Sequence, residues 1–360
     1  MQYKLNVLML SYGSVCFKDR NTPIFRRHMS YASSFSKLTY IQLTKSNISD
    51  ISIKNFKTKN IKVSYYLFGI FKLVKSIDVG DYDIITTKDP FLTGFIGYVL
   101  KLLNKKVKLH VQNHSNFFDN PYWLKEKPYN FLLKKIGVLV IKNADRLRVV
   151  NKHEKEIYNK KYNVKYDKID IAPIPIDPIF YDTNFKDKLD LIDENQSIKI
   201  GWAGRFVKLK RLELLFEIFS NLRLKEENAG LYLAGNYNNS EYNLKKLEKE
   251  FNINPNYLGH LNKEDLKKFY NTIDCLVLTS IYEGYGMVIE EALACGCKVF
   301  ISNDILGSKD LINDGENGII FKSKEHFLKL FPLINTLKPK PIKPKSNQNV
   351  IESLRKTYSK

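Results

Sequence analysis

Two carboxylates stand eight positions apart in the last third of the chain, and a glycine-rich turn follows the first of them. Glu283 opens the run Glu-Gly-Tyr-Gly, and Glu291 lies on an expected helix over 287–295 that Gly296 ends. The apolar run over 275–278 predicts a buried strand just before them. Where such a strand meets a helix N-terminus, free N–H groups can hold phosphate, and carboxylates accept hydrogen bonds from sugar hydroxyls. The alternative is an ordinary helix with an acidic first turn.

A second polar group follows another expected strand, over 198–203. Gly204 and Arg205 come directly after it, and Lys210 and Arg211 follow within a few residues. Arginine can fork onto phosphate oxygens and lysine acts as a point charge, so these residues could bind a diphosphate. Cations so closely spaced are also common on solvated surfaces, and the residues alone leave both interpretations open.

The elements that must position these residues alternate along the chain. We expect helices at 23–35, 92–103, 287–295 and 349–359, and strands at 6–11, 82–87, 107–113, 198–203, 231–235, 275–278 and 299–302. Strands that alternate with helices in both halves predict an α/β protein with two doubly wound parallel sheets. Arg26, Arg27 and His28 fall on the first helix, where we expect a solvated face.

The pattern Glu-Gly-Tyr-Gly-x4-Glu-Ala-Leu-Ala-x-Gly-x-x-Val resembles the Glu-x7-Glu signature of the family 4 glycosyltransferases. The resemblance covers nearly the whole chain and is firmest over 198–321. It implies the GT-B architecture, in which two Rossmann-like domains face each other across a cleft. The domains expected from it are an acceptor-binding domain over 1–173, a nucleotide-sugar-binding domain over 174–336, and a basic linker and helix over 337–360 that returns to the first domain.

The resemblance also assigns roles to single residues. It places Glu283 near the donor sugar and Glu291 on the nucleotide ribose, and it places Gly13 in an acceptor or phosphate loop. The residues that it assigns to donor binding are, in chain order, Gly204, Arg205, Lys210, Gly259, His260, Gly284, Tyr285, Gly286, Met287 and Glu291. Arg211 stands where the family has a glycine.

One histidine follows the strand expected over 107–113. His114 could serve as a base or a hydrogen-bond partner near neutral pH, although a lone histidine is more often structural. A strand followed by histidine is similar to a family segment whose histidine faces the donor sugar, and this resemblance makes His114 catalytic together with Glu283. We expect His110, inside the strand, to be structural.

The positive charge is concentrated in the first half of the chain. Residues 1–175 carry 31 Lys and Arg against 13 Asp and Glu, a net charge of +18, whereas residues 176–360 carry 27 against 25, a net charge of +2. Such a field attracts nucleic acid, an anionic membrane surface or an acidic acceptor, unless it reflects a lysine-rich composition with no partner. Aromatic residues and lysines over 116–142 fit a membrane interface, and equally a core-packing helix. We expect no nucleic acid, because its known motifs are missing.

Other features bear on location and on cofactors. We expect no signal peptide, because the first residues pass quickly into a polar, basic stretch, and no transmembrane helix, because no apolar run approaches about 20 residues. The four cysteines form no disulfide framework, so we expect a reducing, cytoplasmic location, with peripheral contact to the inner face of the membrane. The Asp-x-Asp at 81–83 precedes its strand, at the wrong end for a site. We therefore expect no metal and no cofactor.

Together with the resemblance, these features predict an enzyme, and the resemblance implies a retaining, metal-independent hexosyltransferase. It would move a sugar from a UDP- or GDP-sugar to a glycan or lipid-linked acceptor in surface polysaccharide or glycolipid synthesis. One alternative is another GT-B nucleotide-sugar enzyme, such as an epimerase. The other is a basic membrane- or nucleic-acid-binding protein that has lost catalysis.

Overall fold

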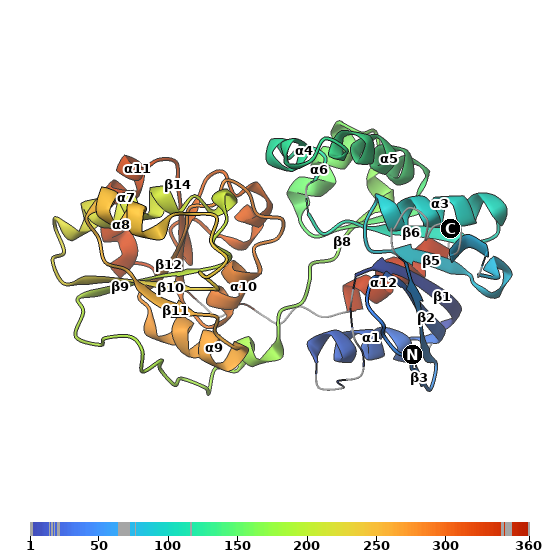
Figure 1. Ribbon diagram of the computed structural model, residues 1–360, viewed down its shortest axis with the longest axis horizontal. Helices are drawn as coiled ribbons and strands as arrows, with labels where there is room; N and C mark the ends of the chain where they lie inside the picture. The colour runs from blue at the N-terminus through green and yellow to red at the C-terminus, as the bar shows by residue number, and fades with distance from the viewer. Residues whose placement is uncertain are drawn as a thin grey trace. The chain divides into compact units, whose positions relative to one another are not determined.

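The chain divides into two compact units in the computed structural model (Figure 1), which describes residues 3–13, 15, 17, 19, 22–63, 73–75, 77–115, 117–339, 342 and 348–358. Unit 1 comprises residues 1–174 and 346–360, and unit 2 comprises residues 175–345. The division falls beside the boundary predicted after residue 173. Most of the basic linker predicted before the last helix lies outside the described residues.

Unit 1 contains an eight-stranded sheet in the order β3-β4-β2-β1-β5-β6-β7-β8, parallel except for the edge strand β3. Its strands are β1 (Tyr3–Tyr12), β2 (Phe35–Thr44), β3 (Ser52–Ile53), β4 (Phe56–Lys62), β5 (Ile84–Thr87), β6 (Lys108–Gln112), β7 (Arg146–Val149) and β8 (Ile169–Ile171). The chain builds outward from β1 on one side and from β5 on the other. The strand order therefore reverses between β1 and β5, which is where open parallel sheets bind ligands.

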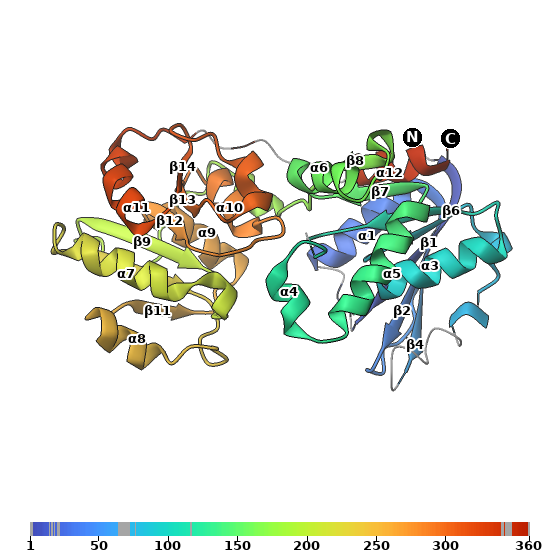
Figure 2. The same cartoon turned by 90° about the horizontal axis from the view of Figure 1, so that it is seen from above.

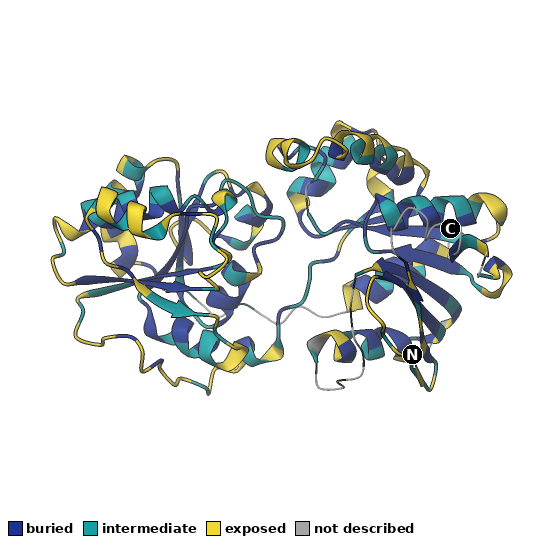
Figure 3. Ribbon diagram, viewed as in Figure 1, coloured by how far each residue is buried: buried dark blue, intermediate teal, exposed yellow. Residues whose placement is uncertain are grey.

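Helices cover both faces of this sheet (Figures 1 and 3). They are α1 (Pro23–Ser33), α3 (Leu92–Leu103), α4 (Pro121–Glu126), α5 (Asn130–Asn143), α6 (Lys152–Lys160) and α12 (Gln348–Tyr358), with 3-10 turns at Val79–Asp81 and Tyr166–Lys168. Successive side chains of a strand point to opposite faces. Leu8 and Leu10 accordingly pack with α3 and α5, whereas Val7 and Met9 pack with α1 and α12.

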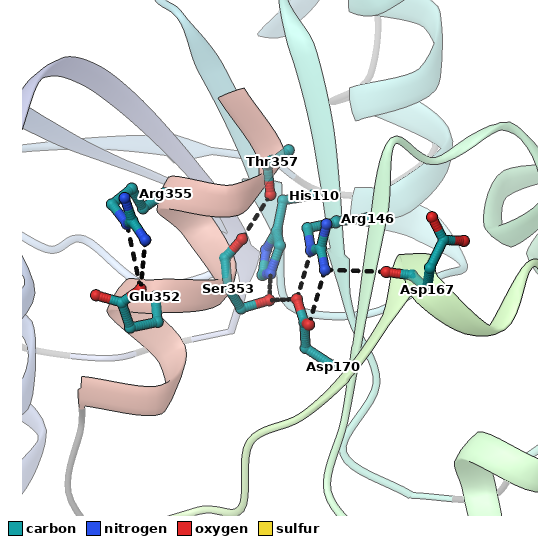
Figure 4. Close-up of polar contacts among 8 residues, drawn as sticks. All are labelled: His110, Arg146, Asp167, Asp170, Glu352, Ser353, Arg355 and Thr357. Carbon is teal, nitrogen blue, oxygen red and sulfur yellow. Dashed lines mark hydrogen bonds and ion pairs between the residues drawn. The ribbon is translucent and has the colours of Figure 1, made fainter. Parts of the chain in front are cut away.

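The last helix, α12, is held in unit 1 by both apolar and polar contacts (Figure 4). Its Val350, Ile351 and Leu354 are buried in the core that contains Val7 and Met9. Ser353 Oγ donates to Asp170 Oδ2 at 2.7 Å and lies 3.0 Å from His110 Nε2. The helix therefore completes one face of the sheet.

His110 is structural, as the sequence predicts. It is fully buried, and burial lowers its pKa to about 3, so the ring is neutral. Thr86 Oγ1 lies 2.8 Å from His110 Nδ1, on the side of the ring opposite Ser353. Both ring nitrogens are therefore occupied within the core.

Unit 2 contains a six-stranded parallel sheet in the order β11-β10-β9-β12-β13-β14. Its strands are β9 (Ile198–Ala203), β10 (Ala229–Ala234), β11 (Asn256–Gly259), β12 (Cys275–Leu278), β13 (Lys298–Ser302) and β14 (Gly318–Phe321). Its helices are α7 (Leu212–Arg223), α8 (Leu244–Phe251), α9 (Lys263–Thr272), α10 (Met287–Ala294) and α11 (Lys324–Leu330), with 3-10 turns at Pro178–Tyr181, Lys208–Lys210, Leu306–Leu311 and Phe331–Asn335. The strand order reverses between β9 and β12.

Figures 1 and 2 show unit 2 from two directions, and in Figure 1 α7 and α8 lie above its strands and α9 lies below them. The face opposite α7 packs on α9, where Ile273 and Phe269 come so close to Gly201 that a Cβ there would lie 2.4 Å from Ile273. The sequence-based prediction of two doubly wound parallel sheets is confirmed. The predicted strands over 198–203 and 275–278 and the predicted helix over 92–103 coincide with β9, β12 and α3.

Candidate active site

The residues singled out in the second half of the chain meet where the strand order of unit 2 reverses. Gly204 follows β9 directly, and the turn that begins at Glu283 follows β12. These two strands are neighbours and run parallel, so their carboxyl ends share one edge of the sheet. This is the place at which an α/β sheet opens a crevice for a ligand.

An ion pair joins the two segments. Lys210 Nζ contacts Glu283 Oε1, and Ser280 Oγ donates to the same carboxylate oxygen at 2.8 Å. The two charged side chains are only 10% and 13% exposed. Gly204 lies against Lys210, because a Cβ at Gly204 would be 3.5 Å from the lysine Cε. The structure thus brings Glu283 to Gly204 and Lys210, although Lys210 and Glu283 are 73 positions apart in the sequence.

Arg211 explains how the loop before Lys210 is held. Its φ of 50° lies in the left-handed region that favours glycine, the residue found here in the resembled family. The guanidinium offsets this strain with bonds to three partners: Thr279 O at 2.9 Å, Ser302 Oγ at 2.9 Å and Asp304 Oδ2 at 3.0 Å. Because Thr279 Oγ1 also donates to the Lys210 carbonyl at 2.9 Å, the loop is tied to the end of β12.

The N-terminus of α10 is open to a ligand. Gly286 occupies the N-cap with φ 71°, and among the described residues no side chain caps the first N–H groups. A Cβ at Gly286 would lie 2.4 Å from Ser308 Oγ, which donates to Tyr285 O at 2.9 Å. The close approach of Ser308 requires glycine here, and the uncapped N–H groups carry the partial positive charge that attracts phosphate.

Two adjacent carboxylates on α10 have different surroundings. Glu290 is fully buried, with Tyr181 Oη donating to Oε1 at 3.0 Å and Tyr285 Oη bonded to Oε2. Glu291 is 8% exposed, and Tyr270 Oη donates to its Oε2 at 3.3 Å. Burial raises the pKa of Glu291 to about 7, and the neighbouring Glu290 adds to the shift. Sequence reasoning missed Glu290, because nothing local distinguishes it from Glu291.

The other predicted donor residues lie at the same edge of the sheet. Arg205 is exposed, and among the described residues its guanidinium has no polar partner. Gly259 ends β11 with φ 72° and accepts a hydrogen bond from Gly235 N at 2.7 Å. His260 is exposed, and Met287 is 40% exposed at the start of α10. Gly284 is half-buried within the turn.

In unit 1, His114 and Gly13 lie at the carboxyl ends of β6 and β1. His114 is half-buried, and its Nδ1 has no hydrogen-bond partner among the described residues. Burial and nearby cations hold the pKa of His114 well below its usual value, so its ring is neutral. Gly13 has φ 122° and donates to Leu43 O at 2.9 Å.

The prediction that the basic residues of α1 lie on a solvated face is wrong for one of the three, His28. His28 is 1% exposed, and its ring packs edge-on against Tyr40 with centroids 5.1 Å apart. Arg26 is exposed and Arg27 is half-buried. The spacing of charges along a helix does not reveal that the sheet beneath it offers an aromatic partner.

The described residues contain neither a cluster of metal-binding side chains nor a helix that could span a membrane. In the part of the chain that the structure describes, no group of three or more His, Cys, Asp and Glu side chains is arranged to hold a metal ion. Within the same residues, no helix has the length and apolar character needed to cross a membrane.

Family models match most of the chain. Residues 46–180 match the model "Glycosyltransferase Family 4", and residues 185–350 match the model "Glycosyl transferases group 1". The chain belongs to the family 4 glycosyltransferases. The resemblance seen in the sequence is confirmed.

Two glycosyltransferases that resemble this chain share only about a quarter of its residues in the matched regions. An uncharacterized glycosyltransferase of Methanocaldococcus jannaschii is 27% identical over 277 residues, which are 73% of this chain and 66% of that protein. The poly(ribitol-phosphate) alpha-N-acetylglucosaminyltransferase of Staphylococcus aureus is 24% identical over 345 residues, which are 94% of this chain and 63% of that protein. The chain therefore spans slightly less than two thirds of these relatives' length.

Solved structures share the fold at low identity. Sucrose-phosphate synthase from Thermosynechococcus elongatus superposes with a TM-score of 0.69 at 15% identity, covering 98% of this chain and 95% of that one. HepE from Anabaena, solved in complex with UDP, gives a TM-score of 0.70 at 15% identity, with the same coverage of both chains. The predicted GT-B fold is confirmed.

Proposed function

We propose that the protein is a retaining, metal-independent glycosyltransferase that moves a sugar from a nucleotide sugar bound by unit 2 to a glycan or lipid-linked acceptor bound by unit 1. The observation that carries the proposal is the Lys210–Glu283 pair beside the open N-terminus of α10. It supplies a cation and free N–H groups for a diphosphate, and a carboxylate for sugar hydroxyls. The donor is a UDP- or GDP-sugar, and UDP is the nucleotide held by the structurally similar HepE.

The proposed chemistry follows from the charge that develops on the leaving nucleoside diphosphate. Lys210, Arg205 and the N–H groups of α10 would stabilise that charge as the sugar–phosphate bond breaks. Glu283 would hold the sugar, and Glu291 would accept hydrogen bonds from the ribose. Gly259 and His260 would receive the base.

Retention through a covalent intermediate would require a carboxylate free to attack the sugar. Glu283 is paired with Lys210, and Glu290 is held by two tyrosines. We therefore infer that the acceptor attacks from the face that the diphosphate leaves, with the leaving phosphate accepting the proton.

A thermal-shift screen tests donor recognition. The protein is heated with UDP, GDP, ADP and their sugars, beside the variant Glu291→Ala. A ligand that binds only the folded state raises the Tm by mass action. We expect one nucleotide to raise the Tm of the native protein and the variant to lose that shift. If no nucleotide raises the Tm, the proposed activity is wrong and the basic binding protein becomes the better interpretation.

A surface on unit 1 supports a membrane-associated acceptor. Helices α3, α4 and α5 expose a group of large apolar side chains, each 44–67% exposed: Leu102, Leu103, Tyr122, Tyr129, Phe131, Leu132 and Leu139. Residues 101–142 also contain nine lysines against two carboxylates, Asp119 and Glu126. Lys127 and Lys135 lie 5.7 Å from the rings of Tyr129 and Phe131. Exposed apolar side chains with lysines beside them suit the interface of an anionic bilayer.

Co-sedimentation with vesicles tests this surface. The native protein should bind vesicles that contain phosphatidylglycerol and bind phosphatidylcholine vesicles weakly. Phe131→Ser with Leu132→Ser should reduce binding about ten-fold or more, because the two side chains leave the apolar layer. Leu224→Ser, at an 82% exposed leucine in unit 2, is the control. Equal binding of all three proteins would show that this surface does not dock.

A further inference from the structure

Three basic side chains converge where the strand order of unit 1 reverses. Lys88 directly follows β5, and His114 lies two residues beyond β6. β5 pairs with β1 on one side and with β6 on the other, so these positions share one edge of the sheet. Arg27 is on α1, next to His28, whose ring packs against Tyr40 of β2. Because strand-order reversal marks the ligand crevice of an open α/β sheet, this edge of unit 1 is a second candidate site.

Tyr40 ties Lys88 to the helix that carries Arg27. Lys88 Nζ donates to Tyr40 Oη at 2.9 Å, and the ring of His28, next to Arg27 in the chain, packs against the Tyr40 ring with centroids 5.1 Å apart. The charge of Arg27 acts on Lys88, and the charges of both residues act on His114. The three side chains are therefore electrostatic neighbours.

No carboxylate compensates these charges. The largest electrostatic effects on Lys88 and His114, within the described residues, come from basic residues alone. The cations among them are Arg27, which acts on Lys88, and Arg148, Lys88 and Arg27, which act on His114. Burial and Arg27 together lower the pKa of Lys88 to about 7. Cations held together in a partly buried place repel each other unless an anion binds between them.

Two buried carboxyl groups of unit 1, those of Asp89 and Glu154, are committed elsewhere. Asp89 Oδ1 accepts from Phe91 N at 2.7 Å, Asp89 Oδ2 bonds to Thr93, and burial raises the pKa of its carboxyl. Burial likewise raises the pKa of Glu154 to about 8, which leaves it mostly protonated at neutral pH. Neither can neutralise the cluster.

The cluster also contains an unused polar atom. His114 Nδ1 is buried without a hydrogen-bond partner in the described structure. By contrast, Arg148 is occupied, because its guanidinium donates to Ala172 O at 2.8 Å, to Pro173 O at 3.3 Å and to Gln112 Oε1. A buried polar atom without a partner costs free energy until a ligand or water supplies one.

We propose that Arg27, Lys88 and His114 form an anion site in unit 1 that binds a phosphate group of the acceptor. The inference rests on the proposed function, since unit 1 is the proposed acceptor domain, and it narrows the acceptor to a phosphate-bearing one. The phosphate could belong to a soluble phosphoester or to a lipid headgroup.

Sulfate is the first probe, because it carries two charges throughout the relevant pH range. The Tm is measured near pH 6.5, with sulfate or with chloride at matched ionic strength, and with UDP present to fill the donor site. Sulfate should raise the Tm of the native protein. Arg27→Gln and Lys88→Met should each weaken the apparent sulfate affinity about ten-fold, since each removes one charge-assisted contact. Met keeps the apolar stem of Lys88 beside Tyr40.

Arg26→Gln is the matched control, because it removes the same charge from an exposed neighbouring position on α1. It should keep the sulfate shift. An equal sulfate shift in the native protein and in both Arg27→Gln and Lys88→Met would overturn the proposal. An equal loss in Arg26→Gln would also overturn it, because the effect would then be one of net charge.

The donor readout separates this inference from the proposed function. The UDP-induced shift should persist in Lys88→Met and Arg27→Gln, because both residues lie in unit 1. If UDP does not bind the native protein, the sulfate series is repeated in a Lys210→Met background, where a remaining sulfate shift cannot come from the proposed donor site. The anion site would then stand while the proposed donor site fails.

Two further probes identify the source of the phosphate. Glycerol 3-phosphate represents a soluble phosphoester, and vesicles that contain phosphatidic acid represent a lipid headgroup. If glycerol 3-phosphate raises the Tm and Lys88→Met removes that shift, the acceptor is a soluble phosphoester. If Lys88→Met weakens vesicle binding and Arg26→Gln does not, the acceptor is a lipid. If Lys88→Met alters neither response, the site does not bind phosphoesters and the proposal is wrong.

Discussion

At the residue scale, the Lys210–Glu283 pair has the largest consequences for the proposed reaction. Both side chains are mostly buried, and burial makes each charge depend on the other. A diphosphate that approaches Lys210 would share its charge with Glu283, and the carboxylate would be left to accept from sugar hydroxyls. Within the pair, the charges of Lys210 and Glu283 neutralise each other.

Replacing Lys210 by methionine tests this role. Lys210→Met should lower turnover about 100-fold, because a preorganised charge on the leaving group is lost. Steady-state release of nucleoside diphosphate is the measurement. Lys208→Met is the control, since Lys208 is exposed and pairs with Glu213 at the surface. Comparable turnover in Lys210→Met and Lys208→Met would show that Lys210 does not stabilise the leaving group.

The raised pKa of Glu291 leads us to expect that a neutral residue at this position stabilises the fold but weakens donor binding. Its pKa of about 7 exceeds the ordinary value of 4.5, so its contribution to stability is full below about pH 4.5 and is lost as the pH rises through about 7. At pH 8, Glu291→Gln should raise the free energy of unfolding by about 2 kcal/mol, and the gain should vanish near pH 5. Urea unfolding of the native protein and of Glu291→Gln at both pH values measures this difference in the free energy of unfolding.

The same variant should bind the donor more weakly at pH 8, because a neutral amide accepts a weaker hydrogen bond from ribose than a carboxylate does. Donor affinity of the native protein should itself fall as the pH drops below about 7. A stability difference that does not change with pH would contradict the assigned burial of Glu291.

At the scale of elements, the start of α10 depends on glycine for two separable reasons. Gly286 has a positive φ, and Ser308 leaves no room for a Cβ. Gly315 has a positive φ of 84° as well, but a Cβ there would meet nothing within 4 Å. Comparing alanine substitutions at Gly286 and Gly315 therefore separates the cost of a positive φ from the cost of a steric clash.

Gly315→Ala should lower the free energy of unfolding by about 1 kcal/mol, the cost of a left-handed alanine. Gly286→Ala should lower it by about 2 kcal/mol more, because Ser308 must move. Chemical denaturation measures both, and Gly286→Ala should also weaken donor binding by displacing the N–H groups of α10. Equal costs at the two positions would show that Ser308 moves aside freely.

At the scale of the whole molecule, unit 1 is assembled from both ends of the chain. Ser353 is the polar link, because its hydroxyl joins His110 of β6 to Asp170 of β8, which is in turn paired with Arg146 (Figure 4). The core of unit 1 is therefore incomplete until the last residues are in place.

Ser353→Ala should lower the free energy of unfolding of unit 1 by about 1 to 3 kcal/mol, since two buried polar groups lose a partner. Glu352→Ala is the control. Its ion pair with Arg355 is at the surface and should contribute about 0.5 kcal/mol or less. Hydrogen exchange of β6 and β8 amides follows the effect locally. Unchanged protection in Ser353→Ala would mean that apolar contacts alone hold α12.

Much of the fold was predictable, because its signals are local. The apolar runs that became β9, β12 and α3 lie within a few residues each, and the predicted bounds coincide with the observed ones. The candidate site was predictable only through motif spacing and family resemblance. Glu290 is held by Tyr181 and Tyr285, whereas Glu291 is held by Tyr270, and no short pattern contains all of these residues.

The sequence by itself determined the α/β class, the strand–helix alternation, the family and the excess of positive charge in the first half, because each is a property of composition or of short-range spacing. Only the tertiary structure decided which charges meet. Lys210 and Glu283 are 73 positions apart, and Tyr40 and Lys88 are 48 positions apart. The physical reason is that parallel strands distant in the chain end at one edge of a sheet, so electrostatic partners are chosen by strand order.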